Sequence, residues 1–591
     1  MNSSKINRRM CVVFVVLQLC FGGLIVRLFL VQLLHGEELR ERSAAHRANR
    51  DLPQVKRGEI RDRHGRVLAL NGDLVSVYAD PKFMISAPEV VARKLAPVLD
   101  KPESEIASIL HKKDRKFVWL KRNLQYSALR EIHPITSRVR GLEYQIHGKR
   151  FYPKGELACH VIGNTNFENK GIQGIEFCYN DYLLNKNSEQ ARKKPKFSKA
   201  VHVTGKKQPA RLTGLKEIDE GNNADGNSVI LTIDEYIQHL TEEALNDACK
   251  EWDAVGGIAI VMESKTGQIL ALANYPNYDL NRYAKSPEQS KRNLAIWMWY
   301  EPGSVFKIIP AAAAVNEGIA TPESVEDCEL GAYRVPNGPL IHDVKPNGWL
   351  TLSQILRKSS NIGITKIAAR LVQKRLDKYT YKFGFGQKTG IDLPYERVGS
   401  LYALKHWNEY SLGSVPFGQG LSVTPIQMLN AMNTIATGGL LMRPYVTRQI
   451  AYSDGQPIKQ FYPIAVRRVI SEETAEQMTQ MLVGSASLSI KEKAEATEEI
   501  EYKVAGKTGT AQKAEKGKGY VSGKVMTTFV GFLPAEKPQV SIIVVIDEPR
   551  GAPYSSRVTI PIFKRIAEGT IRYLNQDTVF AQRFTSPTSV R

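Results

Sequence analysis

Residues 301–316 read EPGSVFKIIPAAAAVN: a proline–glycine turn, then Ser304, then Lys307, then an apolar run. The turn and the run predict a helix that starts near Ser304, which places Lys307 one turn later on the same face. A serine hydroxyl is a weak nucleophile until a neighbouring base takes its proton. A lysine can be that base when burial and a second nearby cation lower its pKa. The stretch therefore predicts a serine nucleophile with a lysine base.

A second polar cluster, Ser359-Ser360-Asn361, follows downstream, between basic and apolar residues. A hydroxyl and an amide two positions apart can converge on a nucleophile, where one relays a proton and the other holds the base or the substrate amide. The same triplet also occurs as a helix cap. Both interpretations stay open for Ser359 and Asn361.

The tripeptide Lys-Thr-Gly occurs three times, at 265–267, 388–390 and 507–509. The first joins two apolar stretches and the second lies in a glycine-rich loop, so both are interpreted as turns. Only the third is flanked on both sides as a strand would be, and a glycine in a strand lets a substrate backbone lie alongside. Lys507 can then bind a carboxylate, and the backbone N–H groups of Thr510 and Ser304 can form an oxyanion hole.

Toward the N-terminus, residues 10–34 are almost entirely apolar or small, and three basic residues, Lys5, Arg8 and Arg9, precede them. A bilayer core needs ~20 apolar residues, whereas the apolar part of a cleavable signal peptide has ~7–15. Positive charge stays on the cytoplasmic side of a membrane. We therefore expect a cytoplasmic tail at 1–9, one uncleaved transmembrane anchor at 10–34, and the following residues outside the cytoplasm.

The region from 35 to 227 begins with charged residues and then alternates apolar and polar residues at 67–70 and 75–78, a pattern that predicts short strands. From Arg192 to Lys207 the chain carries many basic residues, and a stretch rich in glycine and asparagine follows at 221–226. The basic stretch is either a solvated loop at a domain boundary or a contact to anionic lipid or wall polymer.

The C-terminal part shows strand patterns at both of its ends. Strands are expected at 229–233, 257–262, 268–273, 527–533 and 540–546, a long amphipathic helix from about Asp234, and a closing helix at 561–574. Strands at both ends with helical segments between them predict one α/β domain whose sheet brings its ends together. The residues from 577 onward are expected to form a flexible tail.

The 591 residues include 81 Lys and Arg against 60 Asp and Glu, a formal net charge of +21, and 42% of them are hydrophobic. This composition is typical of globular proteins and excludes wholesale disorder, collagen-like repetition and a disulfide-stapled miniprotein. Zinc-finger spacing and RNP-like motifs are absent from the sequence, so no nucleic-acid partner is expected. A membrane or cell-wall surface fits the basic excess.

The sequence has no Cys-x-x-Cys and no histidine pair with metal-ligand spacing, so neither a metal nor another cofactor is expected. Cys159 and Cys178 can form a disulfide in an oxidising compartment. Sequence alone does not bring two Cβ atoms within reach, so this pairing stays open.

In this order, Ser304-x-x-Lys307, Ser359-x-Asn361 and Lys507-Thr508-Gly509 resemble the signature of the serine penicillin-recognising enzymes. The segments 57–65 and 150–155 further resemble the N-terminal module of class B penicillin-binding proteins, the bacterial peptidoglycan D,D-transpeptidases. Residues 301–303 and Ile308 look more like septal (FtsI-type) members than elongation-specific ones. The basic stretch 192–207 and the tripeptide 554–556, where many members carry glycines, depart from the family pattern.

The resemblance implies a multidomain fold with a single N-terminal transmembrane helix. An α+β pedestal, a dimerisation-like domain, would span 35–227. An α/β penicillin-binding (transpeptidase, beta-lactamase-like) domain, with a five-stranded antiparallel sheet between helices, would span 228–576, and a flexible tail 577–591.

The resemblance also implies a reaction. Ser304 would attack the D-Ala–D-Ala bond of a stem peptide, expel D-alanine, and pass the acyl group to the side-chain amine of a neighbouring stem, while beta-lactams would stay on Ser304. The site would comprise catalytic, substrate-binding and oxyanion-hole groups: Ser304, Lys307, Ser359 and Asn361; Lys507, Thr508, Gly509 and Thr510; and the N–H groups of Ser304 and Thr510.

The family further implies where the protein acts and with what. It would lie in the bacterial inner membrane with its catalytic domain outside the cytoplasm, and would act in septal wall synthesis during division. A SEDS-type glycosyltransferase would meet it through the anchor, and other divisome membrane proteins would be partners.

Three alternatives remain. The first is an elongation-type class B transpeptidase. The second is a beta-lactamase. Class A beta-lactamases carry the motif Glu-x-x-Leu-Asn downstream of Ser-x-Asn, whereas this chain has it at 242–246, before Ser304, where it is interpreted as a helix surface. The third is a penicillin-binding sensor or scaffold without turnover, against which the presence of all the reactive side chains argues.

Overall fold

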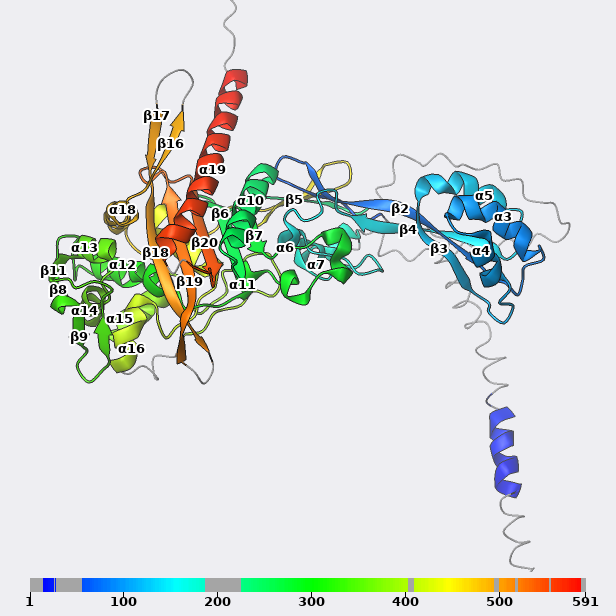
Figure 1. Ribbon diagram of the computed structural model, residues 1–591, viewed down its shortest axis with the longest axis horizontal. Helices are drawn as coiled ribbons and strands as arrows, with labels where there is room; N and C mark the ends of the chain where they lie inside the picture. Colours follow the sequence, from blue (N-terminus) through cyan, green and yellow to red (C-terminus); the bar gives the residue numbers. More distant parts are fainter. Residues whose placement is uncertain are drawn as a thin grey trace, which may run out of the picture. The chain divides into compact units, whose positions relative to one another are not determined.

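The computed structural model describes residues 14–25, 27, 56–185, 225–401, 409–493, 499–515, 519–551 and 554–585 (Figure 1). The chain divides into two compact units, Met1–Val55 and Lys56–Arg591. In the first unit, residues 14–25 are helical and their side chains are exposed. The rest of the expected anchor, except residue 27, and the expected tail at 1–9 lie outside the described residues. No helix in the described ranges is long and apolar enough to cross a membrane.

The first part of the second unit is a mixed α+β region. Its strand β2 (Val67–Ala79) pairs antiparallel with both β3 (Val118–Gln125) and β4 (Leu142–Phe151). Alternate residues of β2, such as Val75 and Val77, are buried in one apolar core with residues of three helices, because successive side chains of a strand point to opposite faces. These helices are α3 (Pro88–Leu99), α4 (Glu103–Leu110) and α5 (Leu129–Thr136). The short elements of this region are β1 (Ile60–Arg61), η2 (Tyr126–Ala128), α6 (Cys159–Ile162), α7 (Gly174–Cys178) and α8 (Asn180–Leu183).

A buried ion cluster joins the two segments that carry the family resemblance in this region. Arg57 Nε lies 2.6 Å from one carboxylate oxygen of Glu176, and Arg150 Nε lies 2.5 Å from the other. Arg150 Nη1 also donates to the backbone oxygen of Gly58 at 2.7 Å. Because a buried charge is costly unless it is paired, Glu176 holds segments 57–58 and 150 together.

One sheet is shared by the two regions that the sequence assigned to separate domains. Strand β5 (Ser228–Leu231) pairs parallel with β1 and antiparallel with β13 (Thr447–Ala451), and β14 (Pro457–Gln460) extends the sheet beyond β13. The full order is β14-β13-β5-β1-β2-β3, with β4 also on β2. Strand β5, which begins at the expected domain boundary, therefore pairs with strands of both regions.

A five-stranded antiparallel sheet forms the centre of the C-terminal region, in the order β18-β19-β20-β6-β7. Its strands are β6 (Gly256–Glu263), β7 (Ile269–Tyr275), β18 (Ala505–Glu515), β19 (Gly519–Leu533) and β20 (Val540–Asp547). Strands from the start of the region, β6 and β7, thus continue the hairpin of β18 and β19 through β20, as the strand patterns at both ends predicted.

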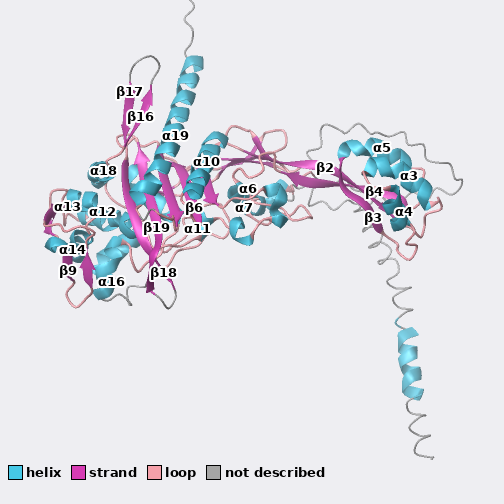
Figure 2. Ribbon diagram, in the orientation of Figure 1, coloured by secondary structure: helices cyan, strands magenta, loops and turns pink. Residues whose placement is uncertain are grey.

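Helices cover both faces of this sheet (Figure 2). Ala259 and Val261 of β6 belong to a core with α10 (Glu235–Glu251) and α19 (Ser555–Thr585), whereas Ile258 and Ile260 belong to the core that contains α12 (Ile308–Asn316), α14 (Asn361–Leu371) and α17 (Pro425–Ala436). The expected antiparallel sheet between helices is confirmed. Helix α19 begins before the expected 561 and continues to Thr585, past the point at which a tail was expected.

The remaining elements of the C-terminal region are shorter helices and small two-stranded sheets. They are η3 (Leu280–Lys285), η4 (Glu288–Lys291), α11 (Leu294–Trp297), η5 (Gly303–Lys307), β8 (Val325–Asp327), η6 (Glu329–Gly331), β9 (Ala332–Arg334), β10 (Leu340–His342), β11 (Trp349–Thr351), α13 (Leu352–Lys358), α15 (Gln373–Lys382), α16 (Glu409–Ser414), η8 (Val415–Phe417), β12 (Leu440–Met442), β15 (Ala465–Arg468), α18 (Glu472–Ala486), β16 (Ser489–Lys493) and β17 (Glu499–Lys503).

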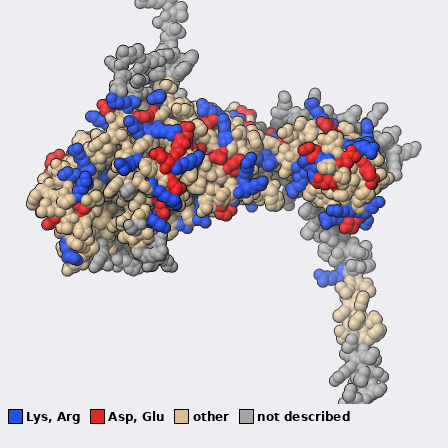
Figure 3. Space-filling model, viewed as in Figure 1, with Lys and Arg blue, Asp and Glu red and all other residues tan. Residues whose placement is uncertain are grey.

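Two open questions concern the cysteines and the charge. Cys159, which is buried, and Cys178, which is exposed, are both free thiols. Basic side chains are scattered over the visible face of the molecule among acidic ones (Figure 3). The basic stretch 192–207 lies outside the described residues.

Candidate active site

The nucleophile segment is a 3-10 turn, η5, that leads directly into α12. Gly303 begins the turn with a φ of +56°, which favours glycine, and its N–H donates to the Gly418 oxygen at 3.0 Å. Ser304 is half-buried and Lys307 is fully buried. The structure therefore places Ser304 at a helix start, as predicted, one turn from a buried lysine.

The Ser359 hydroxyl joins two of the three motifs to each other. It follows α13 in a left-handed conformation with a φ of +59°. Its Oγ accepts hydrogen bonds from Lys307 Nζ and from Lys507 Nζ, both at 3.1 Å. Lys307 Nζ also donates to the Ser359 backbone oxygen. Lys307 and Lys507, which are far apart in the sequence, thus meet at the Ser359 hydroxyl, which can pass a proton between them.

The two lysines differ in the cause and size of their pKa shifts. Burial, and then the charge of Lys507, lower the pKa of Lys307 well below its ordinary value, while Asp343 opposes the shift. Burial alone lowers the pKa of Lys507 to about 8. Because two adjacent buried cations are unfavourable, the lowered pKa of Lys307 favours its neutral form, which is the form that a base needs.

Asp343 holds the second motif in place, and the sequence analysis missed it. Its carboxylate accepts from the hydroxyl of Ser360 and from the N–H of Asn361, both at 2.6 Å, and from the N–H of Ile362 at 3.1 Å. It therefore caps the N-terminus of α14, whose first N–H groups have no partner within the helix. Asp343 follows β10, far from the triplet in sequence, so no local pattern could have indicated this role.

The amide and the second serine of this motif have different partners from those expected. Asn361 Nδ2 donates to the backbone oxygen of His342 at 2.8 Å. Ser360 is the N-cap of α14, and its Oγ accepts from the N–H of Gly363. Ser360 therefore caps a helix, as one interpretation allowed, and Ser359 contacts the two lysines, whereas the amide of Asn361 bonds to the backbone. Asn361 is half-exposed and does not contact Lys307.

The third Lys-Thr-Gly lies on β18, at an edge of the central sheet, as predicted from its flanks. A Cβ added at Gly509 would stand 3.0 Å from the Pro302 oxygen and 3.0 Å from a Val305 methyl group. Those distances are too short for an unstrained contact. Glycine at 509 therefore lets β18 pack directly against the turn that carries Ser304.

The expected oxyanion-hole segment lies beside the same turn. A Cβ added at Gly303 would stand 3.5 Å from the Thr510 oxygen, so the backbones on either side of the candidate site approach closely. The Thr510 hydroxyl accepts from the N–H of Ser555 at 3.3 Å, and Ser555 Oγ donates to the Thr528 oxygen at 2.6 Å. Ser555 belongs to the tripeptide that departs from the family pattern, and it supports Thr510.

Of the other two Lys-Thr-Gly triplets, the first lies in the turn between β6 and β7 and the second in an irregular loop after α15. Lys265 is exposed between β6 and β7. Lys388 is also exposed, and the Thr389 N–H and hydroxyl both donate to Glu396 at 2.6 Å. Neither triplet contacts Ser359 in the part of the chain that the structure describes.

Glu301 is a second residue whose role the sequence did not indicate. Its carboxylate accepts from the N–H of Gly420 at 3.1 Å and from the hydroxyl of Tyr520 at 3.0 Å. Burial raises its pKa. Through Glu301, the segment before the nucleophile holds a glycine-rich loop and the start of β19.

The candidate beta-lactamase carboxylate lies elsewhere. Glu242, on α10, accepts from the N–H of Ala158 at 2.8 Å and from Gln238 Nε2 at 2.7 Å. It contacts none of Ser304, Lys307 or Lys507. Within the described ranges, no group of three or more His, Cys, Asp or Glu residues could hold a metal ion.

Comparison with known protein families gives two matches in this chain. Residues 257–568 match the family "Penicillin binding protein transpeptidase domain", and residues 53–212 match "Penicillin-binding Protein dimerisation domain".

Similar full-length proteins carry related names. "Stage V sporulation protein D" of Bacillus subtilis is 32% identical over 97% of this chain and 87% of its own length. "Probable peptidoglycan D,D-transpeptidase PenA" of Neisseria meningitidis is 29% identical over 96% of this chain and 93% of its own. "Peptidoglycan D,D-transpeptidase FtsI" of Escherichia coli is 28% identical over 88% of this chain and 84% of its own.

Solved structures show the same fold. A peptidoglycan synthetase from Bifidobacterium adolescentis aligns with a TM-score of 0.64 at 24% identity, over 91% of this chain and 97% of that one. Penicillin-binding protein 3 of Mycobacterium tuberculosis, complexed with aztreonam, aligns with a TM-score of 0.64 at 24% identity, over 88% and 97%.

Proposed function

The chain belongs to the class B penicillin-binding proteins, the peptidoglycan D,D-transpeptidases, and on that premise we propose that Ser304 is the nucleophile with which it cross-links stem peptides. One observation carries this proposal: Ser359 Oγ accepts hydrogen bonds from both Lys307 and Lys507 at 3.1 Å, beside the turn that presents Ser304. The proposed base, Lys307, and the proposed carboxylate-binding cation, Lys507, thus both contact the Ser359 hydroxyl, which can relay a proton between them.

In the acylation step, neutral Lys307 takes the proton of Ser304 as Oγ attacks the carbonyl of the penultimate D-alanine. The N–H groups of Ser304 and Thr510 stabilise the resulting oxyanion. Lys507, with Thr508 and Gly509 beside it on the edge strand, holds the terminal carboxylate of the donor. When the intermediate collapses, the peptide bond breaks, the proton moves to the leaving amine, and D-alanine departs from the acyl ester.

In the second step, the side-chain amine of a neighbouring stem attacks the ester. Its proton passes through Ser359 and Lys307 to the departing Ser304 oxygen, and the new amide is the cross-link. Asn361, at the start of α14, positions the stem peptide. A beta-lactam follows the first step only, because its leaving group stays attached after the ring amide opens.

Mass spectrometry after incubation with benzylpenicillin tests the nucleophile. We expect one adduct of the intact antibiotic mass on the peptide that contains Ser304, and none in Ser304→Ala, whose folding should be nearly unchanged. Labelling of another serine, or persistent labelling in the variant, would discard the assignment. Turnover of a stem-peptide donor with an amine acceptor then separates a transpeptidase from a sensor that is acylated without turnover.

We also propose a role in septal wall synthesis. It is supported by the resemblance of residues 301–303 and Ile308 to septal members and by the similarity to a protein named FtsI. The similarity to a protein named for stage V of sporulation supports a second candidate, wall synthesis in sporulation. Fluorescent fusions distinguish these roles from elongation: a band at the division site, a ring around a forespore, or a signal along the side wall.

The anchor is proposed from the apolar sequence of residues 10–34 and the basic residues before it. It would hold the protein in the inner membrane with the catalytic region outside, and a SEDS-type glycosyltransferase would bind through it, alongside other divisome proteins. Alkaline extraction should leave the full chain in the membrane fraction and release a chain that begins at residue 35. Co-purification of a co-expressed SEDS-type protein should require residues 10–34.

For domain organisation, we propose the pedestal at 35–227 and the transpeptidase domain at 228–576, between the terminal segments 1–9 and 577–591. The family matches at 53–212 and 257–568 support this division. Limited proteolysis should cut first between 186 and 224 and leave two fragments that stay associated through β1 and β5.

A further inference from the structure

Two arginines and two tryptophans stack in series beside the segment that carries the nucleophile. The Arg292 guanidinium lies 4.6 Å from the ring centre of Trp297, and that of Arg397 lies 4.1 Å from Trp297 and 4.9 Å from Trp299. We call these four residues the Arg–Trp ladder. Such cation–π contacts hold long side chains in fixed positions.

The ladder has hydrogen-bond donors that the described residues of the chain do not use. Neither arginine forms an ion pair or a side-chain hydrogen bond with the residues that the structure describes. Arg292 is exposed, and Trp299 keeps 46% of its surface exposed. The stacked guanidiniums therefore retain N–H donors at their edges, beside an indole face that is open to a ligand.

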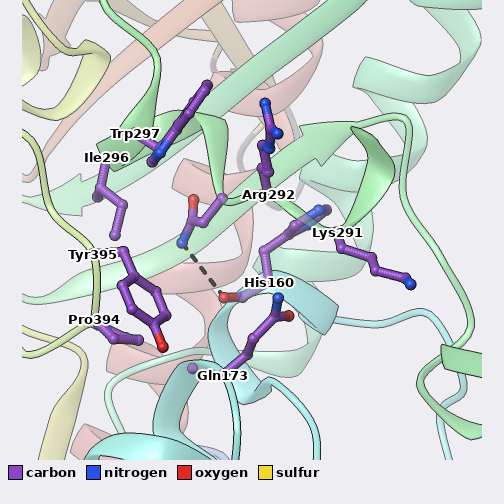
Figure 4. Close-up of a pocket in the computed structure, with 10 residues that line it drawn as sticks. His160, Gln173, Lys291, Arg292, Ile296, Trp297, Pro394 and Tyr395 are labelled. Atoms are coloured by element: carbon purple, nitrogen blue, oxygen red, sulfur yellow. Dashed lines mark hydrogen bonds between the residues drawn. The ribbon is translucent and has the colours of Figure 1, made fainter. Parts of the chain in front are cut away.

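A small cavity opens beside one end of the ladder. It has a volume of about 130 Å³ and is lined by Trp297, Arg292, Tyr395, Gln173 and Asn293, among others. Figure 4 shows Trp297 and Arg292 next to each other at one end of this cavity and Gln173 and Tyr395 at the other, while Lys291 points away. An aromatic wall with a few polar groups resembles a ligand subsite, and because the volume is below the roughly 300 Å³ of ordinary ligand pockets, the cavity can take one substituent of a larger ligand.

Backbone hydrogen bonds connect the ladder to the segment that leads to Ser304. The N–H of Arg397 donates to the oxygen of Ile296 at 3.0 Å, and Tyr300 pairs with Val423. Trp299 stands five residues before Ser304, and five extended residues span at most roughly 18 Å. A stem peptide of about four residues spans at most roughly 14 Å. The ladder therefore lies no more than roughly 18 Å from Ser304, which is within the range that a stem peptide and the first sugar of its glycan can span.

We propose that the Arg–Trp ladder binds the glycan strand of the peptidoglycan substrate. Sugar rings pack their C–H faces on the exposed indole of Trp299, and the guanidiniums of Arg397 and Arg292 donate to ring hydroxyl and acetamido oxygens. Gln173 receives the groups that enter the cavity. The proposal rests on the proposed function, because the glycan strand is the part of the peptidoglycan substrate that lies outside the site at Ser304. A protein partner on the same surface is the competing occupant.

The test measures binding of the full-length chain in detergent to glycan strands from which all peptides have been removed. We expect wild type and Ser304→Ala to bind alike, because the ladder acts without the nucleophile. Trp299→Ala and Arg397→Gln should each weaken binding by about tenfold, the loss expected when a buried or stacked anchor is removed. Trp349→Ala, a matched tryptophan with 71% of its surface exposed, should change it less than about twofold.

Acylation of each variant by benzylpenicillin, which carries no glycan, reports whether the active site is still folded. If Trp299→Ala is not acylated, Arg397→Gln decides the matter. Wild-type glycan affinity in a folded ladder variant, or no glycan binding by the wild type, overturns the proposal and leaves a protein partner for this surface. Failure of the proposed function appears separately, as absence of the Ser304 adduct in a chain whose glycan binding is intact.

Discussion

At the scale of single residues, the candidate site depends on one hydroxyl between two lysines. Ser359 Oγ contacts Lys307 and Lys507 at equal distances, and burial lowers the pKa of both lysines. The neutral form of Lys307 can accept a proton, whereas the charged form of Lys507 can bind a carboxylate. The two roles need opposite protonation states, so they have opposite pH dependences.

The rate of acylation should therefore pass through a maximum as the pH rises. The neutral base form of Lys307 appears above its lowered pKa, and the cation of Lys507 is lost as the pH passes through about 8. We expect the second-order rate constant for benzylpenicillin to rise at low pH and fall above about pH 8. In Lys507→Arg, the guanidinium stays charged, so the falling limb should move to higher pH. An unmoved limb would exclude Lys507 as its origin.

Asp343 should act as a positioning residue, with a signature in the same profile. Its carboxylate holds the start of α14 and raises the pKa of Lys307. In Asp343→Asn, we expect the maximal acylation rate to fall by about 10- to 100-fold and the rising limb to move to lower pH. The exposed Asp454→Asn serves as the control. If the stability changes but the limb does not move, the role of Asp343 is structural only.

At the scale of elements, position on the edge strand separates the three Lys-Thr-Gly triplets. Only β18 lies against the nucleophile turn, and the close approach of Gly509 to Pro302 and Val305 shows why a side chain is absent there. The triplets at 265 and 388 have the same three residue types but lie in a turn and a loop, respectively. The element that contains the tripeptide, rather than the tripeptide itself, gives it access to a substrate.

Alanine at each lysine tests this distinction. Lys507→Ala should slow acylation by about 10- to 1,000-fold, since a charge-assisted contact that persists into the transition state is worth ~1.5–4 kcal/mol. Lys265→Ala and Lys388→Ala should change the rate less than about threefold, because exposed turn lysines usually lie within ~0.5 kcal/mol of neutral. A large loss of rate in Lys265→Ala or Lys388→Ala, with none in Lys507→Ala, would show that β18 is not the strand that binds substrate beside Ser304.

At the scale of the whole molecule, the pedestal and the transpeptidase region share a sheet. The N–H of Val229 donates to the oxygen of Glu59, the N–H of Arg63 donates to the oxygen of Ile233, and His64 contacts the buried Asp234 at 3.0 Å. The transpeptidase region alone would expose β5 as an unpaired strand edge, which favours aggregation.

A chain of residues 228–591 should therefore be less stable than one of residues 56–591. The lost contacts include the backbone hydrogen bonds of Val229 and Arg63, that of Leu280 to Gly155, and the contact to Asp234. We therefore expect a decrease of at least roughly 2–4 kcal/mol in the free energy of unfolding, measured from urea denaturation of the benzylpenicillin-binding activity. Adding residues 56–227 in trans should restore part of the difference. Equal urea midpoints would show that the shared sheet contributes little.

The sequence by itself determined the chemistry and the fold class of this protein. A serine and a lysine at helical spacing, a glycine within a strand pattern, and apolar strands at both ends of the C-terminal region are local patterns, because they arise from the periodicities of helices and strands. They indicate Ser304, Lys307, Ser359 and Lys507 as candidates and predict one α/β domain whose sheet brings its ends together, whereas the antiparallel sheet between helices is implied by the family resemblance.

Only the tertiary structure decided which distant groups support these residues. Asp343 at the start of α14, Glu301 between a loop and β19, Ser555 beside Thr510, and β5 within a shared sheet all involve partners from separate parts of the chain. Hydrogen bonds and packing act at a few ångströms regardless of separation along the chain. A sequence pattern extends over a few turns or a strand, so such contacts leave no local signal, and they appear only when the chain has folded.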